Sequence, residues 1–117
     1  MRPPGEIAFV ALWSKDLEVQ RRFFVQVMGY EVQHETPDAL VLGGPGTTIV
    51  LQKAEGDMAH LDGQTHVGYF VDSVDEWTYH LSAQGASVLS WGADIGEGHR
   101  AIVVQAPGGQ SFALVGA

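Results

Sequence analysis

The chain has 117 residues, which is enough for one ordinary domain and too few for two. Hydrophobic residues make up 45% of the chain and charged residues 17%, a balance typical of a packed globule and not of a disordered segment. Six Lys and Arg residues oppose fourteen acidic ones, and the net charge of −8 argues against nucleic acid or an anionic membrane as a partner. This charge would favour a cationic ligand, although a need for solubility explains it somewhat better.

The sequence contains no cysteine, which excludes disulfides and thiolate metal sites. The first six residues lack the apolar core of a signal peptide, and no apolar run approaches the length that spans a membrane. We therefore predict a cytoplasmic protein that has no membrane partner.

The first half of the chain predicts a strand, a helix and three short strands. The opening strand, residues 7–13, is apolar on both faces, which indicates cover on both sides. Asp16 is placed to cap a helix over residues 17–28. The apolar stripe of this helix holds Leu17, Phe24, Val27 and Met28. Three strands follow, at residues 30–35, 39–42 and 47–53, with a tight turn at residues 43–46.

A polar connection at residues 54–63 leads into a similar second half. Residues 65–71 form an apolar strand, and Ser73 with Glu76 forms a capping box that begins a helix. The stripe of this helix is Val74, Trp77 and Leu81. Further strands are predicted at residues 87–90, 99–105 and 110–115, with a glycine-rich irregular loop at 91–98 and a hairpin turn at 106–109.

The two halves are copies of one pattern, displaced by 57 positions, the separation of Phe9 from His66. Asp16 takes the helix-capping position that Ser73 has in the second copy. His66 is the one polar side chain on the central part of an otherwise apolar strand, and its counterpart in the first copy is Phe9.

This duplicated pattern resembles the vicinal oxygen chelate superfamily, which includes glyoxalase I, bleomycin-resistance proteins and extradiol dioxygenases. The matching motifs are the two strand-to-helix entries (residues 9–18 and 66–76), the Met-Gly-Tyr helix exit (28–30) and the Ala-Pro-Gly-Gly turn (106–109). The resemblance covers nearly the whole chain. It implies an α+β fold in which two βαβββ modules, about residues 6–53 and 64–116, form a curled mixed sheet (a cup) with the helices outside. We expect one domain over residues 1–117.

Metal binding can be judged from the four positions that hold the ion in enzymes of this superfamily. The resemblance places Phe9, Gln52, His66 and Ala113 there. A divalent metal needs three or four protein ligands, usually His and carboxylate, and one imidazole with one neutral amide is too few. We predict no metal and no cofactor. A metal site would need extra ligands from His99, from Glu97 or from a partner chain.

The predicted cup is apolar and aromatic with a few neutral polar groups, a composition typical of a small-molecule pocket. Its predicted ligand-binding residues are Phe9, Trp13, Gln52, His66, Phe70, Trp91, His99 and Ala113. Trp91 is expected to stack on a flat ligand. Two alternatives stay open: the strand aromatics can be plain core residues, and His66 can be a buried, hydrogen-bonded histidine.

The resemblance to metal-free bleomycin-resistance proteins favours binding over catalysis. It implies a protein that confers resistance by sequestering a hydrophobic or aromatic natural product, such as an antibiotic. The alternative is an enzyme of the same fold, a lyase, isomerase, cyclase or glyoxalase, with His66 as general base or metal ligand. We also expect a homodimer, because pairing with a second copy would cover exposed sheet edges.

Overall fold

A computed structural model describes residues 3–44, 46–96 and 98–117, without the side chains of residues 91–96. The chain divides into two compact units. The first-module unit is Phe9–Thr65, and the second-module unit is His66–Ala117 together with Met1–Ala8. Within the described ranges, no helix is both long and apolar enough to cross a membrane.

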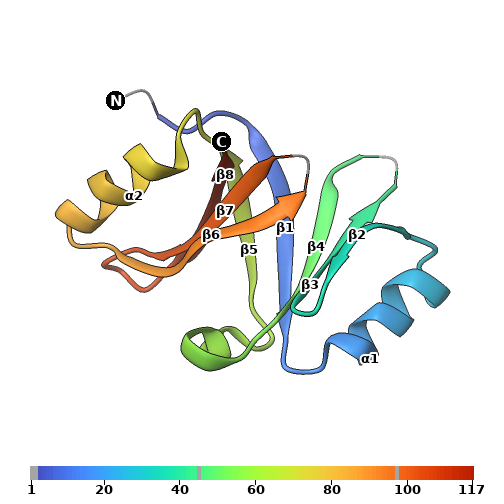
Figure 1. Ribbon diagram of the computed structural model, residues 1–117. Helices are drawn as coiled ribbons and strands as arrows, with labels where there is room; N and C mark the ends of the chain where they lie inside the picture. Colours follow the sequence, from blue (N-terminus) through green and yellow to red (C-terminus); the bar gives the residue numbers. More distant parts are fainter. Residues whose placement is uncertain (1–2, 45, 97) are drawn as a thin grey trace. The chain divides into compact units, whose positions relative to one another are not determined.

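The first-module unit follows the predicted order of a strand, a helix and three strands (Figure 1). Its elements are β1 (Ile7–Ser14, shared with the other unit at its start), α1 (Leu17–Arg21), the π-helix η1 (Arg22–Val27), β2 (Glu31–Thr36), β3 (Ala39–Gly43), β4 (Thr48–Lys53) and the 3₁₀-helix η2 (Gly56–Leu61). The strands lie in the order β2-β3-β4-β1. β1 is parallel to β4, and the other pairs are antiparallel. The polar connection predicted at residues 54–63 therefore contains a helical segment.

The helix of this unit begins where the sequence predicts. Asp16 caps α1, because its carboxylate accepts the Val19 N–H at 3.1 Å. Leu17 of α1 and Phe24 of η1 pack onto a core of three leucines from the sheet, Leu40, Leu42 and Leu51. This contact positions α1 over the β2-β3-β4 strands.

The predicted apolar stripe of this helix is wrong in its second half. Val27 and Met28 are exposed, at 69% and 54%, and Val25 packs against the core with Phe24 instead. The cause is the π-helical turn, in which the Met28 N–H donates to the carbonyl five residues earlier, on Phe23. A π-turn inserts one residue relative to an α-helix, so the side chains after it rotate to another face.

The second-module unit repeats this topology. Its elements are β5 (Thr65–Phe70), α2 (Val74–Ala83), β6 (Ser87–Gly96), β7 (His99–Gln105) and β8 (Ser111–Gly116). The strands lie in the order β5-β8-β7-β6, with β5 parallel to β8. The predicted stripe of α2 is confirmed, since Val74, Trp77 and Leu81 pack with Ile102 and Leu114. The α+β class and the two βαβββ modules are thereby confirmed.

The prediction of an irregular loop at residues 91–98 is wrong over most of that segment. The backbone as far as Gly96 belongs to β6 and pairs with β7, although the register shifts between Ser90 and Ala93 and again between Asp94 and Gly96. Glycine-rich composition predicted a loop, whereas pairing with β7 holds the segment as an irregular strand. Glu97 lies outside the described residues.

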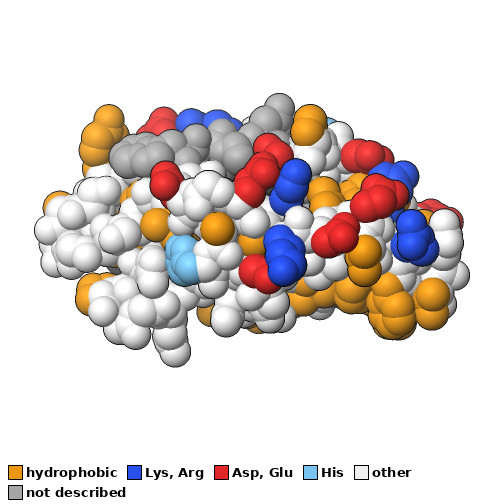
Figure 2. Space-filling model, turned by 90° about the horizontal axis from the view of Figure 1, so that it is seen from below, with side chains coloured by type: hydrophobic (Ala, Val, Ile, Leu, Met, Phe, Trp, Pro, Cys, Tyr) orange, Lys and Arg blue, Asp and Glu red, His pale blue; other side chains and the backbone are white. Residues whose placement is uncertain are grey.

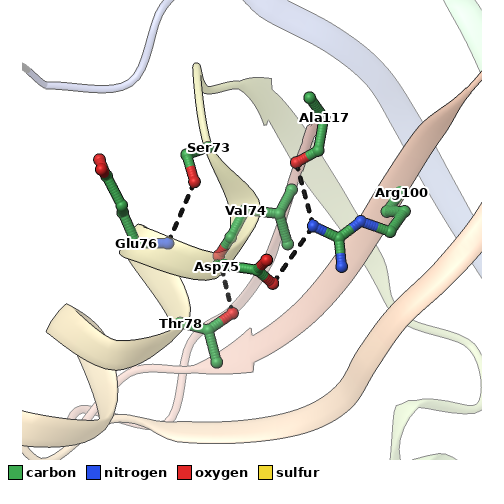
Figure 3. A network of polar contacts seen from close by, with 7 residues as sticks. All are labelled: Ser73, Val74, Asp75, Glu76, Thr78, Arg100 and Ala117. Carbon is green, nitrogen blue, oxygen red and sulfur yellow. Dashed lines mark hydrogen bonds and ion pairs between the residues drawn. The ribbon is translucent and has the colours of Figure 1, made fainter.

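The start of α2 is held by a polar network (Figure 3). Ser73 Oγ accepts the Glu76 N–H at 3.2 Å, which is half of the predicted capping box. Among the hydrogen bonds of the described residues, none runs from the Ser73 N–H back to the Glu76 carboxylate. The Arg100 guanidinium contacts Asp75 Oδ1 at 3.2 Å and donates to the Ala117 carbonyl at 3.2 Å. Arg100 therefore links the start of α2 to the last residue of the chain.

Candidate functional site

Three predicted site residues lie on the parallel pair β1 and β4 of the first-module unit. Phe9 and Trp13 are buried, with 4% and 2% of their surface exposed. The strand register sets Trp13 opposite Gln52. The Gln52 Oε1 atom is buried and accepts no hydrogen bond from any residue that the structure describes. Since a buried acceptor without a donor costs about 1–3 kcal/mol, a water or a ligand donor at this atom would stabilise the protein.

His66 and Ala113 lie on the equivalent parallel pair, β5 and β8, of the second-module unit. His66 is 4% exposed, and its Nδ1 lies 3.2 Å from Ser111 Oγ. Burial lowers the pKa of His66 from 6.5 to about 4, so the ring is neutral at pH 7. Ala113 is buried and faces Gly68 in the strand register. His66 can therefore exchange hydrogen bonds but carries no charge. The sequence did not identify Ser111 as the hydrogen-bond partner of His66, although Ser111 lies two residues before Ala113 and so shares its face of the strand.

These residues do not fit a divalent metal. Of the four superfamily positions, Phe9 and Ala113 have no donor atom, and Gln52 and His66 supply only one neutral donor each. In the part of the chain that the structure describes, no three His, Asp or Glu side chains lie together so that they could hold an ion.

Phe70, one of the predicted site residues, lines a pocket. This side chain is 40% exposed and lies at the end of β5. It lines a pocket of about 470 Å³, which we name the β5–α2 pocket. The other residues that define it come from the N-terminal segment, the β5–α2 connection and the start of α2: Pro3, Gly5, Glu6, Val71, Asp72, Ser73, Glu76 and Trp77.

Local hydrogen bonds shape this pocket. The Gly5 N–H donates to the Phe70 carbonyl at 2.7 Å, and the Phe70 N–H donates to the Glu6 carbonyl at 3.0 Å. The N-terminal segment is thus fastened along the end of β5. On the other side, the Ser73 cap fixes the first turn of α2, from which Glu76 and Trp77 extend.

The pocket combines aromatic faces with negative charge. Phe70 and Trp77 supply the rings, and Glu6, Asp72 and Glu76 supply three carboxylates. None of the described residues that line it is basic. Aromatic faces and carboxylates both attract cations. The predicted place of Trp77 on the apolar stripe of α2 is confirmed by its packing, but the sequence did not show that the same ring also borders a pocket.

Two predicted site residues remain. His99 is half-buried at the start of β7 and pairs with Gly96 in the sheet. The side chain of Trp91 lies outside the described residues, so its predicted stacking on a ligand stays a prediction.

Sequence comparison now identifies the family. The glyoxalase-like domain family matches residues 9–115. The chain belongs to this family. The predicted membership of the vicinal oxygen chelate superfamily is thereby confirmed, while the likeness to bleomycin-resistance proteins in particular stays a prediction. No curated protein matches the sequence at a significant level.

Solved structures of this glyoxalase-like fold cover almost the whole chain. A glyoxalase/bleomycin resistance protein/dioxygenase superfamily member from Vibrio splendidus 12B01 is 21% identical, with a TM-score of 0.61 and coverage of 96% of this chain and 98% of that one. Methylmalonyl-CoA epimerase from Mycobacterium tuberculosis is 21% identical, with a TM-score of 0.66 and coverage of 99% and 92%. A variant of the Streptomyces coelicolor methylmalonyl-CoA epimerase, in complex with 2-nitronate-propionyl-CoA, is 19% identical, with a TM-score of 0.67 and coverage of 98% and 99%. At these identities the likeness shows the fold alone.

Proposed function

We propose that this glyoxalase-like protein binds a small aromatic molecule, preferably one with a positively charged amine, and that it needs no metal to do so. The observation that carries the proposal is the β5–α2 pocket, where Phe70 and Trp77 lie with three carboxylates. Its volume of about 470 Å³ is within the range of small-molecule sites.

The expected binding energy has two sources. Burial of an aromatic ring against Phe70 and Trp77 contributes about 1.5–3 kcal/mol, and a cation on an aromatic face adds about 0.5–2 kcal/mol. The net charge of −8 would also raise the association rate of a cation, an effect that salt weakens.

Sequestration is the role that suits such a pocket. Its described lining contains no His, so the buried His66 has no part in it. A natural product or antibiotic that carries an amine would be held without reaction, and its free concentration would fall. The predicted homodimer and the resistance function belong to this proposal.

Tryptophan fluorescence tests the binding step. Benzyltrimethylammonium is the cationic aromatic probe, and benzyl alcohol is its neutral comparator. We expect saturable quenching by the cation and at least about tenfold weaker binding of benzyl alcohol. Phe70→Ala should weaken binding of the cation about tenfold or more, because the ring contact is lost.

The matched control is Tyr79→Ala, which removes an exposed aromatic ring of α2 that is not part of the pocket. This variant should bind the probe like the wild type. Equal binding of the charged and neutral probes, or equal effects of the two substitutions, would contradict the proposal.

A metal-free enzyme is the second candidate, and one finding favours it: solved structures of the same fold include methylmalonyl-CoA epimerases. In that case His66 would act as the base, oriented by Ser111. A pKa of about 4 makes His66 a weak base at neutral pH, which is why we place this candidate second. Solvent deuterium uptake into methylmalonyl-CoA, abolished by His66→Gln, would make the enzyme the preferred candidate.

A further inference from the structure

The geometry points to a second binding site, in the first-module unit, for a small organic anion. The site is a pocket of about 320 Å³ at the ends of β1 and β4, which we name the β1–β4 pocket. We infer that the ammonium groups of Lys15 and Lys53 hold the carboxylate or phosphate of the ligand there. This site is separate from the β5–α2 pocket and does not depend on its function.

Strand topology brings the two lysines to one edge of the sheet. β1 and β4 are parallel, and their register pairs Ser14 with Lys53. Lys15 follows Ser14 directly, so both lysines stand where neighbouring strands end. The backbone is fixed there, because the Lys15 N–H donates to Asp62 Oδ1 at 2.8 Å and the Ala54 N–H donates to the Ser14 carbonyl at 2.9 Å.

Basic residues are concentrated in this pocket to a degree that the composition does not explain. Three of the six Lys and Arg residues of the chain line it: Lys15, Arg21 and Lys53. The chain has only six Lys and Arg residues, and half of them line one cavity.

These three basic residues are not equally paired with carboxylates. Arg21 Nη1 lies 2.7 Å from Glu35 Oε1, and this ion pair raises the pKa of Arg21. The charge of Arg21 is therefore already paired. Lys53 Nζ lies 3.4 Å from Glu55 Oε2 in a half-exposed pair of the kind that contributes little. Lys15 has no ion pair among the described residues. Lys15 and Lys53 are therefore the cations that a ligand can use.

Acidic residues of the pocket compete with an anionic ligand for the basic side chains. Glu35 is occupied by Arg21, and the Asp16 carboxylate accepts the Val19 N–H at 3.1 Å. Glu18 is the remaining carboxylate of the lining. On the face drawn in Figure 2, Lys and Arg side chains lie beside Asp and Glu side chains in the same interspersed way. Because these carboxylates would repel an extended polyanion, the site suits a small anion that reaches the two lysines.

The floor of the pocket defines the rest of the ligand. Leu17, Pro37 and Leu40 supply apolar surface. Thr36 Oγ1 accepts the Asp38 N–H at 3.3 Å, so its hydroxyl hydrogen can be donated to a ligand oxygen. The chemistry fits a small molecule with an apolar body and one anionic group.

Amide NMR titrations with sodium phosphate and with sodium acetate test the inference, at constant pH and ionic strength. We expect saturable shifts at the Lys15, Asp16 and Ala54 amides with at least one of the two anions. Lys15→Gln and Lys53→Gln should each weaken that binding about tenfold, which corresponds to about 1.4 kcal/mol. Saturation by phosphate alone assigns a phosphorylated ligand, and saturation by acetate alone assigns a carboxylate.

Arg22→Gln is the matched control, because Arg22 is exposed and does not line the pocket. It removes the same charge and should leave the shifts unchanged. The inference is overturned if neither anion saturates, or if Arg22→Gln weakens binding as much as the lysine variants do. Lys15 is exposed and Lys53 is partly exposed, and unchanged amide spectra without anion would show that the variants fold.

Discussion

At the scale of single residues, His66 shows how far burial can change a side chain's chemistry. Its position in a repeated strand marked it as special, and the sequence left a buried structural histidine and a functional one both open. The structure adds the contact with Ser111 and a pKa lowered to about 4. Neither could be derived from the sequence, because both depend on what packs around the ring.

The lowered pKa of His66 predicts a specific loss of stability in acid. Unfolded His66 takes up a proton near pH 6.5, whereas folded His66 does so near pH 4, so stability is fully present above pH 6.5 and falls as the pH drops to 4. The loss amounts to about 3 kcal/mol. Urea unfolding of the wild type and of His66→Gln at pH 7, 5.5 and 4.5 should show this loss in the wild type only.

His60→Gln is the control, because His60 is exposed. Its unfolding should keep the pH dependence of the wild type. An NMR titration that gives His66 a pKa near 6.5, with equal slopes in all three proteins, would disprove the burial argument.

At the scale of elements, local signals in the sequence were sufficient to predict helix caps, helix stripes and strand limits where the chain forms regular helices and strands. The caps at Asp16 and Ser73, the stripe of α2 and the limits of β7 were all predicted. The errors come from two departures from regular structure: the π-turn of η1, which is closed by a hydrogen bond between residues five apart, and the irregular β6, which pairs with β7. Periodicity assumes regular geometry and reports neither a π-turn nor a shifted strand register.

The duplication makes the two caps a matched pair. Asp16 and Ser73 each accept an N–H from the residue three positions later, at 3.1 and 3.2 Å. Asp16→Ala and Ser73→Ala should therefore each lower the free energy of unfolding by about 0.5–2 kcal/mol. Thermal or urea unfolding measures the loss. Ser82→Ala, on the exposed side of α2, should cost nothing, and a loss as large as that of Ser73→Ala would refute the capping explanation.

At the scale of the whole molecule, each of the two units has a described pocket, and the two pockets differ in their basic residues. The β5–α2 pocket is aromatic and acidic, while the β1–β4 pocket contains half of the basic residues of the chain. The fold class and the superfamily could be predicted from the repeat. The pockets could not, because each joins side chains from segments whose proximity appears only in the folded chain.

A crystal structure of EDTA-treated protein with benzyltrimethylammonium, collected with anomalous data, tests the central claim most directly. The phenyl ring should lie against Phe70 and Trp77, with the ammonium group facing the carboxylates of Glu6, Asp72 or Glu76, and no anomalous peak should lie at His66. A metal ion bound to the His66 imidazole, or a pocket left empty by the probe at saturating concentration, would contradict the claim.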